Sequence, residues 1–209
     1  MHEDEKYEKF AYSTQFAFSV AKEDNALNRG AYDSMLALRA EGRDLWHVRS
    51  GCESFELQED RIRFSWSPMN GVTIDTVIAP LGMWHVRKHI IRTDRRLEAA
   101  EGAFSVPKDW AGDRPCDRIR TETAADETSA SAHGTRGTSA VFALKGYTQG
   151  EVIHTEPNTN LMAPRCVLPT LHGWIGPGTC ELACAVFTDA GDCLPETIPE
   201  EVIKLAGSL

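Results

Sequence analysis

Alternation between large apolar residues and small or polar residues runs through much of the chain. From Phe10 to Val20 the even positions are aromatic or β-branched, and the odd positions are small or polar. Arg61–Trp66 and Trp84–Ile91 also alternate, and Val72–Ala79 is rich in β-branched residues. A period of two is typical of half-buried strands, because successive side chains point to opposite faces. Shorter candidate strands are Asp33–Leu38, Leu45–Arg49, Ser139–Leu144, Glu151–Thr155 and Glu181–Thr188.

These strands predict the fold class. Many short strands separated by turn residues are typical of an all-β protein, here an antiparallel β-sandwich of about eight or more strands. The one predicted helix is short, near Glu200–Leu205, and follows Pro199 at a favourable starting position. Residues 108–138 are poor in large apolar side chains, and we expect them to form a long mobile loop. The length favours one domain over residues 1–209.

Charge and composition exclude several classes of function. The formal net charge of −9 argues against a nucleic-acid partner, which needs a broad excess of Lys and Arg. Met1–Lys9 is polar and acidic, so we expect no signal peptide, no membrane association and a cytoplasmic location. In that compartment all six cysteines would be free thiols. They are Cys52, Cys116, Cys166, Cys180, Cys184 and Cys193.

Four segments agree with one protein family in kind and in order. They are Tyr7–Val20, Asp33–Leu38, Gly82–Thr93, and Glu156–Leu161 taken together with Pro169–Gly173. Together they resemble the C-terminal part of the proteins grouped under domain of unknown function 2264. The resemblance runs from about residue 7 to residue 187 and implies a β-sandwich that follows a helical toroid. It also implies an action on glycans that contain uronic acid.

The resemblance sets the expected function and its alternatives. This sequence starts where the sandwich would start, so we expect a non-catalytic β-sandwich module whose partner is a helical catalytic domain. An acidic oligosaccharide is a second expected partner. Two alternatives stay open: an autonomous glycoside hydrolase or polysaccharide lyase, and a free-standing carbohydrate-binding module. A docking module predicts an exposed apolar patch, whereas a binding module predicts an exposed aromatic platform.

The candidate site begins with three polar residues of one parity. His85, Arg87 and His89 share one face of a predicted strand, on which the two histidines lie roughly 13 Å apart and cannot chelate one metal ion together. This face is either solvated or lines a cleft. In the second case the Arg87 guanidinium would pair with a carboxylate. Arg87 also belongs to a local basic cluster that could attract an anionic sugar, with Lys88, Arg92, Arg95 and Arg96.

A polar turn and three tryptophans complete the candidates. Asn158 and Asn160 follow Pro157, where they either close a turn on their own backbone or contact a glycan or the helical domain. We place them beside His85 at the edge that faces the helical domain. Trp66, Trp84 and Trp174 are core residues or sugar-stacking platforms. No phosphate-binding glycine loop, nucleophile elbow or zinc-protease motif occurs, and we expect no cofactor and no metal.

Overall fold

The structure, a computed structural model, describes most of the chain from residue 36 onward. The described ranges are 36–43, 52–107, 110–111, 114–115, 120–135, 137–154, 166–191 and 193–209. The predicted strands Phe10–Val20 and Leu45–Arg49 lie outside them, as do Asn158 and Asn160. The described strands are β1 Leu36–Ala40, β2 Cys52–Leu57, β3 Ile62–Met69, β4 Val72–Leu81, β5 Trp84–Thr93, β6 Leu97–Gly102, β7 Val106–Pro107, β8 Trp110–Ala111, β9 Arg114–Pro115, β10 Thr121–Ala125, β11 Ser129–Gly134, β12 Gly137–Lys145, β13 Gln149–His154, β14 Cys166–Ile175 and β15 Gly178–Asp189. A single described helix, α2, spans Glu200–Ser208.

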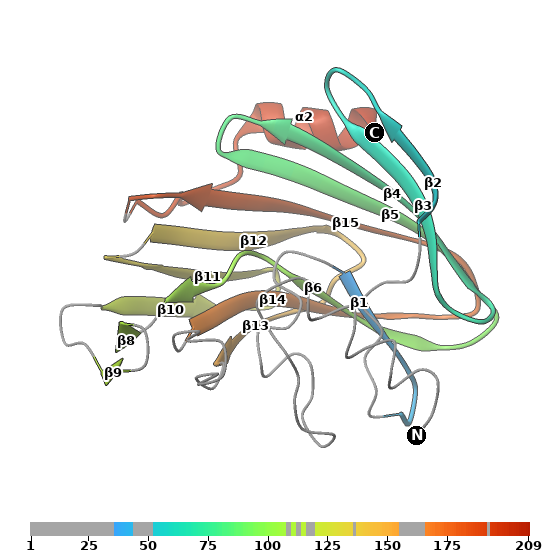
Figure 1. Cartoon of the computed structure of the whole chain (residues 1–209), viewed down its shortest axis with the longest axis horizontal. Coiled ribbons are helices and arrows are strands. Elements are labelled where there is room, and N and C mark those ends of the chain that lie inside the picture. The colour runs from blue at the N-terminus through green and yellow to red at the C-terminus, as the bar shows by residue number, and fades with distance from the viewer. Residues whose placement is uncertain are drawn as a thin grey trace.

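Two antiparallel sheets face each other (Figure 1). The eight-stranded sheet has the order β10-β11-β12-β15-β5-β4-β3-β2, and the five-stranded sheet has the order β1-β6-β14-β13 with β7 beside β14. β8 and β9 pair with each other as a separate two-stranded ladder. The all-β sandwich predicted from the alternating pattern is therefore confirmed. β5 lies between β15 and β4, so its inward-facing side chains point into the middle of the sandwich.

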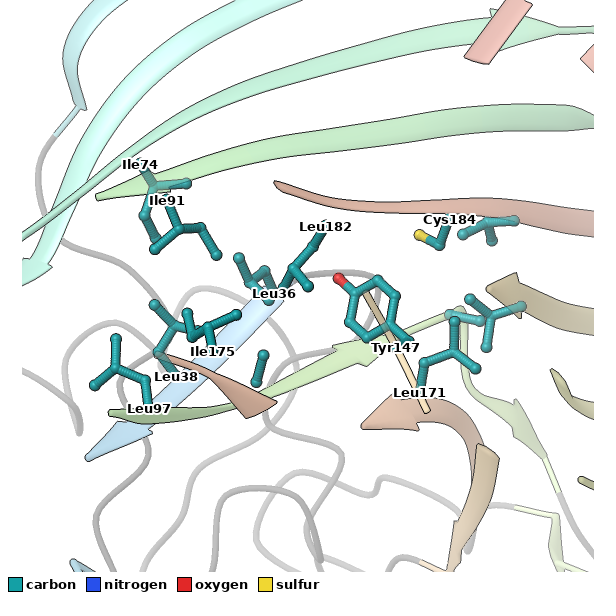
Figure 2. Packing of buried hydrophobic residues seen from close by; sticks show 14 of the residues in the cluster. Leu36, Leu38, Ile74, Ile91, Leu97, Tyr147, Leu171, Ile175, Leu182 and Cys184 are labelled. Carbon is teal, nitrogen blue, oxygen red and sulfur yellow. The ribbon is translucent and has the colours of Figure 1, made fainter. Parts of the chain in front are cut away.

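The main core fills the space between the sheets. Leu36 and Leu171 of the five-stranded sheet meet Ile74, Ile91 and Leu182 of the eight-stranded sheet. Figure 2 shows Tyr147 and Cys184 among these aliphatic side chains, between the two layers. The alternating pattern places these residues on inward faces, and their burial is the main driving force for the association of the two sheets.

Helix α2 covers the outer face of the eight-stranded sheet. Its buried residue Val202 packs in a cluster with Trp84, Val86 and Phe187 of β5 and β15. Trp66 is buried in the main core, so the core interpretation of Trp66 and Trp84 is confirmed. Pro199 precedes the helix as predicted, and Glu200 and Glu201 occupy its first turn, where carboxylates interact favourably with the helix dipole.

The predicted loop at 108–138 is wrong over most of its described part. Strands β10, β11 and the start of β12 form a ladder there, although few of their residues are large and apolar. The buried side chains Ala130 and Ala132 are small, and the backbones pack closely. A Cβ atom on Gly150 would lie 1.9 Å from the carbonyl oxygen of Ser129. Backbone pairing and close approach, rather than bulky side chains, hold this segment in the sheet.

Four of the six cysteine side chains lie in the described part of the chain. Cys52, Cys180, Cys184 and Cys193 are free thiols, whereas Cys116 and the side chain of Cys166 lie outside the described part. No helix within the described ranges is both long enough and apolar enough to span a bilayer.

Candidate functional site

The polar face of β5 points into the sandwich. Arg87 is 2% exposed and His89 is 3% exposed, while His85 is half-buried nearer the strand's end. The interpretation of this face as solvated is therefore wrong for Arg87 and His89. These two side chains are buried because β5 is a central strand and the five-stranded sheet covers this part of its inner face. Alternation in the sequence identifies the shared face but cannot tell which layer lies above it.

Glu101 of β6 is the partner that makes this burial possible. Arg87 donates from Nη1 to Glu101 Oε1 at 2.5 Å and to the Gly102 carbonyl oxygen at 2.9 Å. The Tyr147 hydroxyl donates to Glu101 Oε2 at 3.0 Å, and His89 Nε2 lies 3.1 Å from the same oxygen. Glu101 itself is fully buried. The Arg87–Glu101 ion pair thus joins the two sheets through the core. The positive charge comes from the eight-stranded sheet and the negative charge from the five-stranded sheet, so neither is buried alone.

The network continues across the eight-stranded sheet. Trp66 Nε1 donates to Thr76 Oγ1 at 3.1 Å, and Thr76 Oγ1 lies 2.9 Å from His89 Nδ1. An indole nitrogen can only donate, so Thr76 Oγ1 accepts from Trp66 and still has a proton and a second lone pair for a hydrogen bond with His89 Nδ1. Burial alone would raise the pKa of Glu101, but His89 and Arg87 outweigh it and lower this pKa to about 2. The carboxylate is therefore charged at any physiological pH.

A groove opens where the network reaches the surface. It is a hollow of about 480 Å³ between the β2–β3 turn, the β4–β5 turn and the segment that follows β6. His85 and Arg87 contribute to its lining, together with Ile78 and Pro80. Exposed apolar side chains stand around it, and Leu57 and Met83 are the most exposed of those that line it. The groove therefore combines an apolar rim with a few polar groups, a common composition for ligand sites.

A second, more polar hollow adjoins the first. It has a volume of about 250 Å³ and is lined by Ser105, Asp189 and other residues at the start of β12 and the end of β15. Phe104 and Thr188 line both hollows, so Phe104 stands between them. Phe104 is 41% exposed, and its ring meets His85 at a centroid distance of 5.9 Å in a near-perpendicular arrangement. Together the two hollows form one groove with an aromatic ring near its middle, which we call the Phe104 groove.

His85 is held in one protonation state by Arg87. Arg87 Nε donates to His85 Nε2 at 2.9 Å, and a guanidinium has no lone pair with which to accept in return. Nδ1 of His85 therefore carries the ring proton. Burial, with the nearby charge of Arg87, lowers the pKa of His85 to about 3. His85 is thus an uncharged hydrogen-bond donor at the wall of the Phe104 groove.

The basic cluster predicted near β5 is neutralised in the structure. Each of its cations lies beside a carboxylate, so none offers an uncompensated charge to an anionic sugar. The pairs are Arg87–Glu101, Lys88–Glu181, Arg92–Asp75, Arg95–Asp94 and Arg96–Glu41.

The outer face of the five-stranded sheet carries a second group of polar and aromatic side chains. His172 Nε2 lies 2.9 Å from Glu151 Oε2, and its Nδ1 lies 3.8 Å from Glu98 Oε1. Trp174, two residues further along β14, is 47% exposed, and the Arg96 guanidinium lies 4.5 Å from its ring centroid. Trp174 is therefore not a core residue, but a cation already covers part of its ring.

The predicted site residues thus have different outcomes. The three residues of β5 lie together, with Arg87 and His89 inside the core and His85 at the groove. The predicted closeness of His85 to Asn158 and Asn160 stays a prediction, because both asparagines are outside the described residues. Sequence reasoning missed Glu101, Tyr147 and Phe104. Glu101 had a signal: it is the one charged residue on a parity otherwise occupied by Leu97, Ala99 and Ala103. Among the described residues, no three His, Cys, Asp or Glu side chains gather as a metal site would require.

Comparison with known proteins gives a family and a fold. The family model described as the DUF2264 C-terminal domain matches residues 1–197. The chain is similar in structure to a mutant of heparan sulfate lyase HepC from Pedobacter heparinus, with a TM-score of 0.52 and 6% identity over 76% of this chain and 24% of that one. It is also similar to 4-alpha-glucanotransferase from Thermococcus litoralis, with a TM-score of 0.47 and 9% identity over 74% of this chain and 27% of that one. A galactose mutarotase related enzyme from Lactobacillus acidophilus has a TM-score of 0.46 and 7% identity over 76% of this chain and 80% of that one.

Sequence comparison adds nothing beyond the family. None of the curated proteins compared matches the chain. At 6% identity the likeness to HepC shows a shared β-sandwich fold alone, and the chain spans about a quarter of that protein's length.

Proposed function

The chain belongs to the family of the DUF2264 C-terminal domain, and from this membership we propose that it is the β-sandwich domain of a carbohydrate-active protein. In this proposal the Phe104 groove forms one wall of a glycan cleft. The facing wall, with the acid and base that act on the glycan, belongs to a helical domain. The observation that carries the proposal is the groove itself, a hollow that combines exposed apolar side chains with a few polar groups, one of which is Arg87 of the buried Arg87–Glu101 pair.

The burial of the ionisable groups supports a role without catalysis by this chain alone. Lyases and hydrolases need an acid or base within hydrogen-bond reach of the substrate. Glu101 and Tyr147 have strongly perturbed pKa values, lowered for Glu101 and raised by burial for Tyr147, yet both side chains are sealed between the sheets. Of the carboxylates that line the Phe104 groove, Glu59 and Asp60 come from one turn in the first hollow, and Asp189 lies in the second hollow. Glycoside hydrolysis needs carboxyl groups on both sides of the bond, and in this proposal the helical domain supplies the group on the open side.

The apolar rim supports contact with a second domain. Leu57, Phe55 and Met83 are more than half exposed, and Phe55 and Leu57 lie on the edge strand β2. Exposed apolar groups gathered around a groove are typical of an interaction surface. The length relation to HepC, of which this chain spans about a quarter, agrees with a sandwich that works beside other domains. A helical domain seated on this rim would close the groove from the open side.

We expect the purified chain alone to leave oligosaccharides uncleaved, because one wall cannot place an acid and a base around a glycosidic bond. Adding the helical domain of another member of the same family should produce cleavage. Ultraviolet absorbance of unsaturated ends and an assay of reducing ends would follow both routes of cleavage. Leu57→Asp, at the rim, should reduce the effect of the added domain, whereas Ile203→Asp on the exposed side of α2 should not.

The same assay distinguishes the alternatives. Cleavage by the chain alone that disappears in Asp189→Asn or Glu151→Gln would make the chain an autonomous enzyme and would refute the proposed division of roles. Sugar binding without any effect of an added helical domain would instead favour a free-standing carbohydrate-binding module.

A further inference from the structure

The groove's own chemistry restricts its ligand further. We infer that the Phe104 groove binds an uncharged sugar unit, which stacks on the Phe104 ring and accepts a hydrogen bond from His85 Nδ1. The inference rests on the proposed function, because it assumes that the groove faces a glycan. It replaces the acidic oligosaccharide expected from the sequence with a neutral one at this position.

The first support is the placement of Phe104. Residue Phe104 lines both hollows and is 41% exposed. A hydrogen bond holds its backbone in place. The Phe104 amide donates to Ser139 Oγ at 3.0 Å, and His85 braces the ring edge-on at 5.9 Å. An aromatic ring held in place above a groove offers an apolar surface to the C–H face of a pyranose at little entropic cost.

The second support is the proton on His85. Because Arg87 occupies Nε2, the free donor is Nδ1, and no described residue accepts from it. A neutral donor suits a hydroxyl or ring oxygen, which is itself uncharged. Arg87 does not offer an uncompensated positive charge to a carboxylate of the sugar, because its guanidinium is already paired with the Glu101 carboxylate in the core.

The third support is the sign of the remaining charge. Among the residues that line the two hollows, Arg61 lies beside Asp60 and Arg87 lies beside Glu101. The other charged side chains of the lining are Glu59 and Asp189, both carboxylates. A uronate or sulfate in the groove would meet these like charges with no uncompensated cation, whereas a neutral sugar can use the same carboxylates as hydrogen-bond acceptors.

Binding by the full chain tests the inference. Isothermal titration calorimetry would compare neutral oligosaccharides (cello-, xylo-, manno- and malto-oligosaccharides) with oligogalacturonate and heparan sulfate oligosaccharides. At least one neutral series should bind more tightly than both acidic series. Phe104→Ala should weaken that binding roughly tenfold, as expected when an aromatic contact and its buried area are lost. Phe104→Trp should retain it.

The matched control is Trp174→Ala, which removes a similarly exposed aromatic ring from the outer face of the five-stranded sheet and should leave binding unchanged. The inference is overturned if an acidic series binds as well as the best neutral one, if no neutral series binds, or if Trp174→Ala weakens binding while Phe104→Ala does not. None of these results touches the cleavage assay with the added helical domain. A failure of the inference is therefore distinguishable from a failure of the proposed function.

Discussion

Glu101→Gln is expected to destabilise the fold by about 3–5 kcal/mol, because it leaves the buried Arg87 guanidinium without its counter-charge. Glu101 is fully buried and also accepts from Tyr147, so three core groups lose a charged partner at once. For a chain of this size the loss corresponds to a fall in Tm of roughly 6–20 °C. Urea denaturation followed by circular dichroism would measure the change in unfolding free energy.

Glu98→Gln is the matched control for this prediction. Glu98 lies on the same strand but on the outer face, where it pairs with the partly exposed Arg39. Pairs of this kind contribute about 0–1 kcal/mol. Equal losses for Glu98→Gln and Glu101→Gln would contradict the claim that the buried pair joins the sheets.

A double variant separates the pair from its surroundings. Arg87→Met with Glu101→Leu removes both charges and keeps the side-chain volume, so it should cost less than either single change. If the losses simply add, the two residues are not coupled, and the network described for the core is wrong.

Acid is expected to weaken the fold in two successive stages. His85 has its pKa lowered from 6.5 to about 3 by burial and by Arg87. Between these values the unfolded chain binds a proton that the folded chain excludes, so the unfolding free energy falls as the pH decreases below 6.5. One such group contributes a slope on the order of 1.4 kcal/mol per pH unit. His172, whose pKa burial also lowers, adds to this stage.

The second stage belongs to Glu101. Its pKa falls from an ordinary value of 4.5 to about 2 in the folded chain, so its contribution is complete above 4.5 and is lost as the pH decreases toward 2. Urea denaturation at a series of pH values would resolve both stages. His85→Gln should reduce the slope of the first stage, leaving the part due to His172, and Glu101→Gln should remove the second stage. A stability that stays constant or rises from pH 6.5 down to 4.5 would contradict the assigned state of His85.

The sequence predicts most of the architecture because the period-2 signal is strong where strands are half-buried. It predicts β3, β4 and β5 closely, since large and polar residues alternate over most of β3 and β5 and β4 is rich in β-branched residues. The same signal fails over β10 and β11. The buried residues of β11 are the small side chains Ala130, Ser131 and Ala132, and both strands are ordered by backbone pairing with the neighbouring strands, which composition does not reveal. Burial of small side chains leaves little trace in a hydropathy pattern.

The candidate site is predicted only in part for a similar reason. Alternation groups His85, Arg87 and His89 on one face, but whether that face meets water or a second sheet depends on which strands lie opposite. Glu101 comes from that opposite layer and supplies the charge that keeps Arg87 buried. The Phe104 groove depends on the meeting of the β6 end with two turns of the other sheet, which no local pattern encodes.

The most direct test of the central claim is a chemical-shift map of the ¹⁵N-labelled chain during titration with the best-binding oligosaccharide. We expect the shifted amides to cluster on the Phe104 groove, at the β2–β3 turn, at Gly82–Arg87, at Phe104 and Ser105, and at Thr188. Shifts that cluster instead around His172 and Trp174 on the outer face of the five-stranded sheet would contradict the claim.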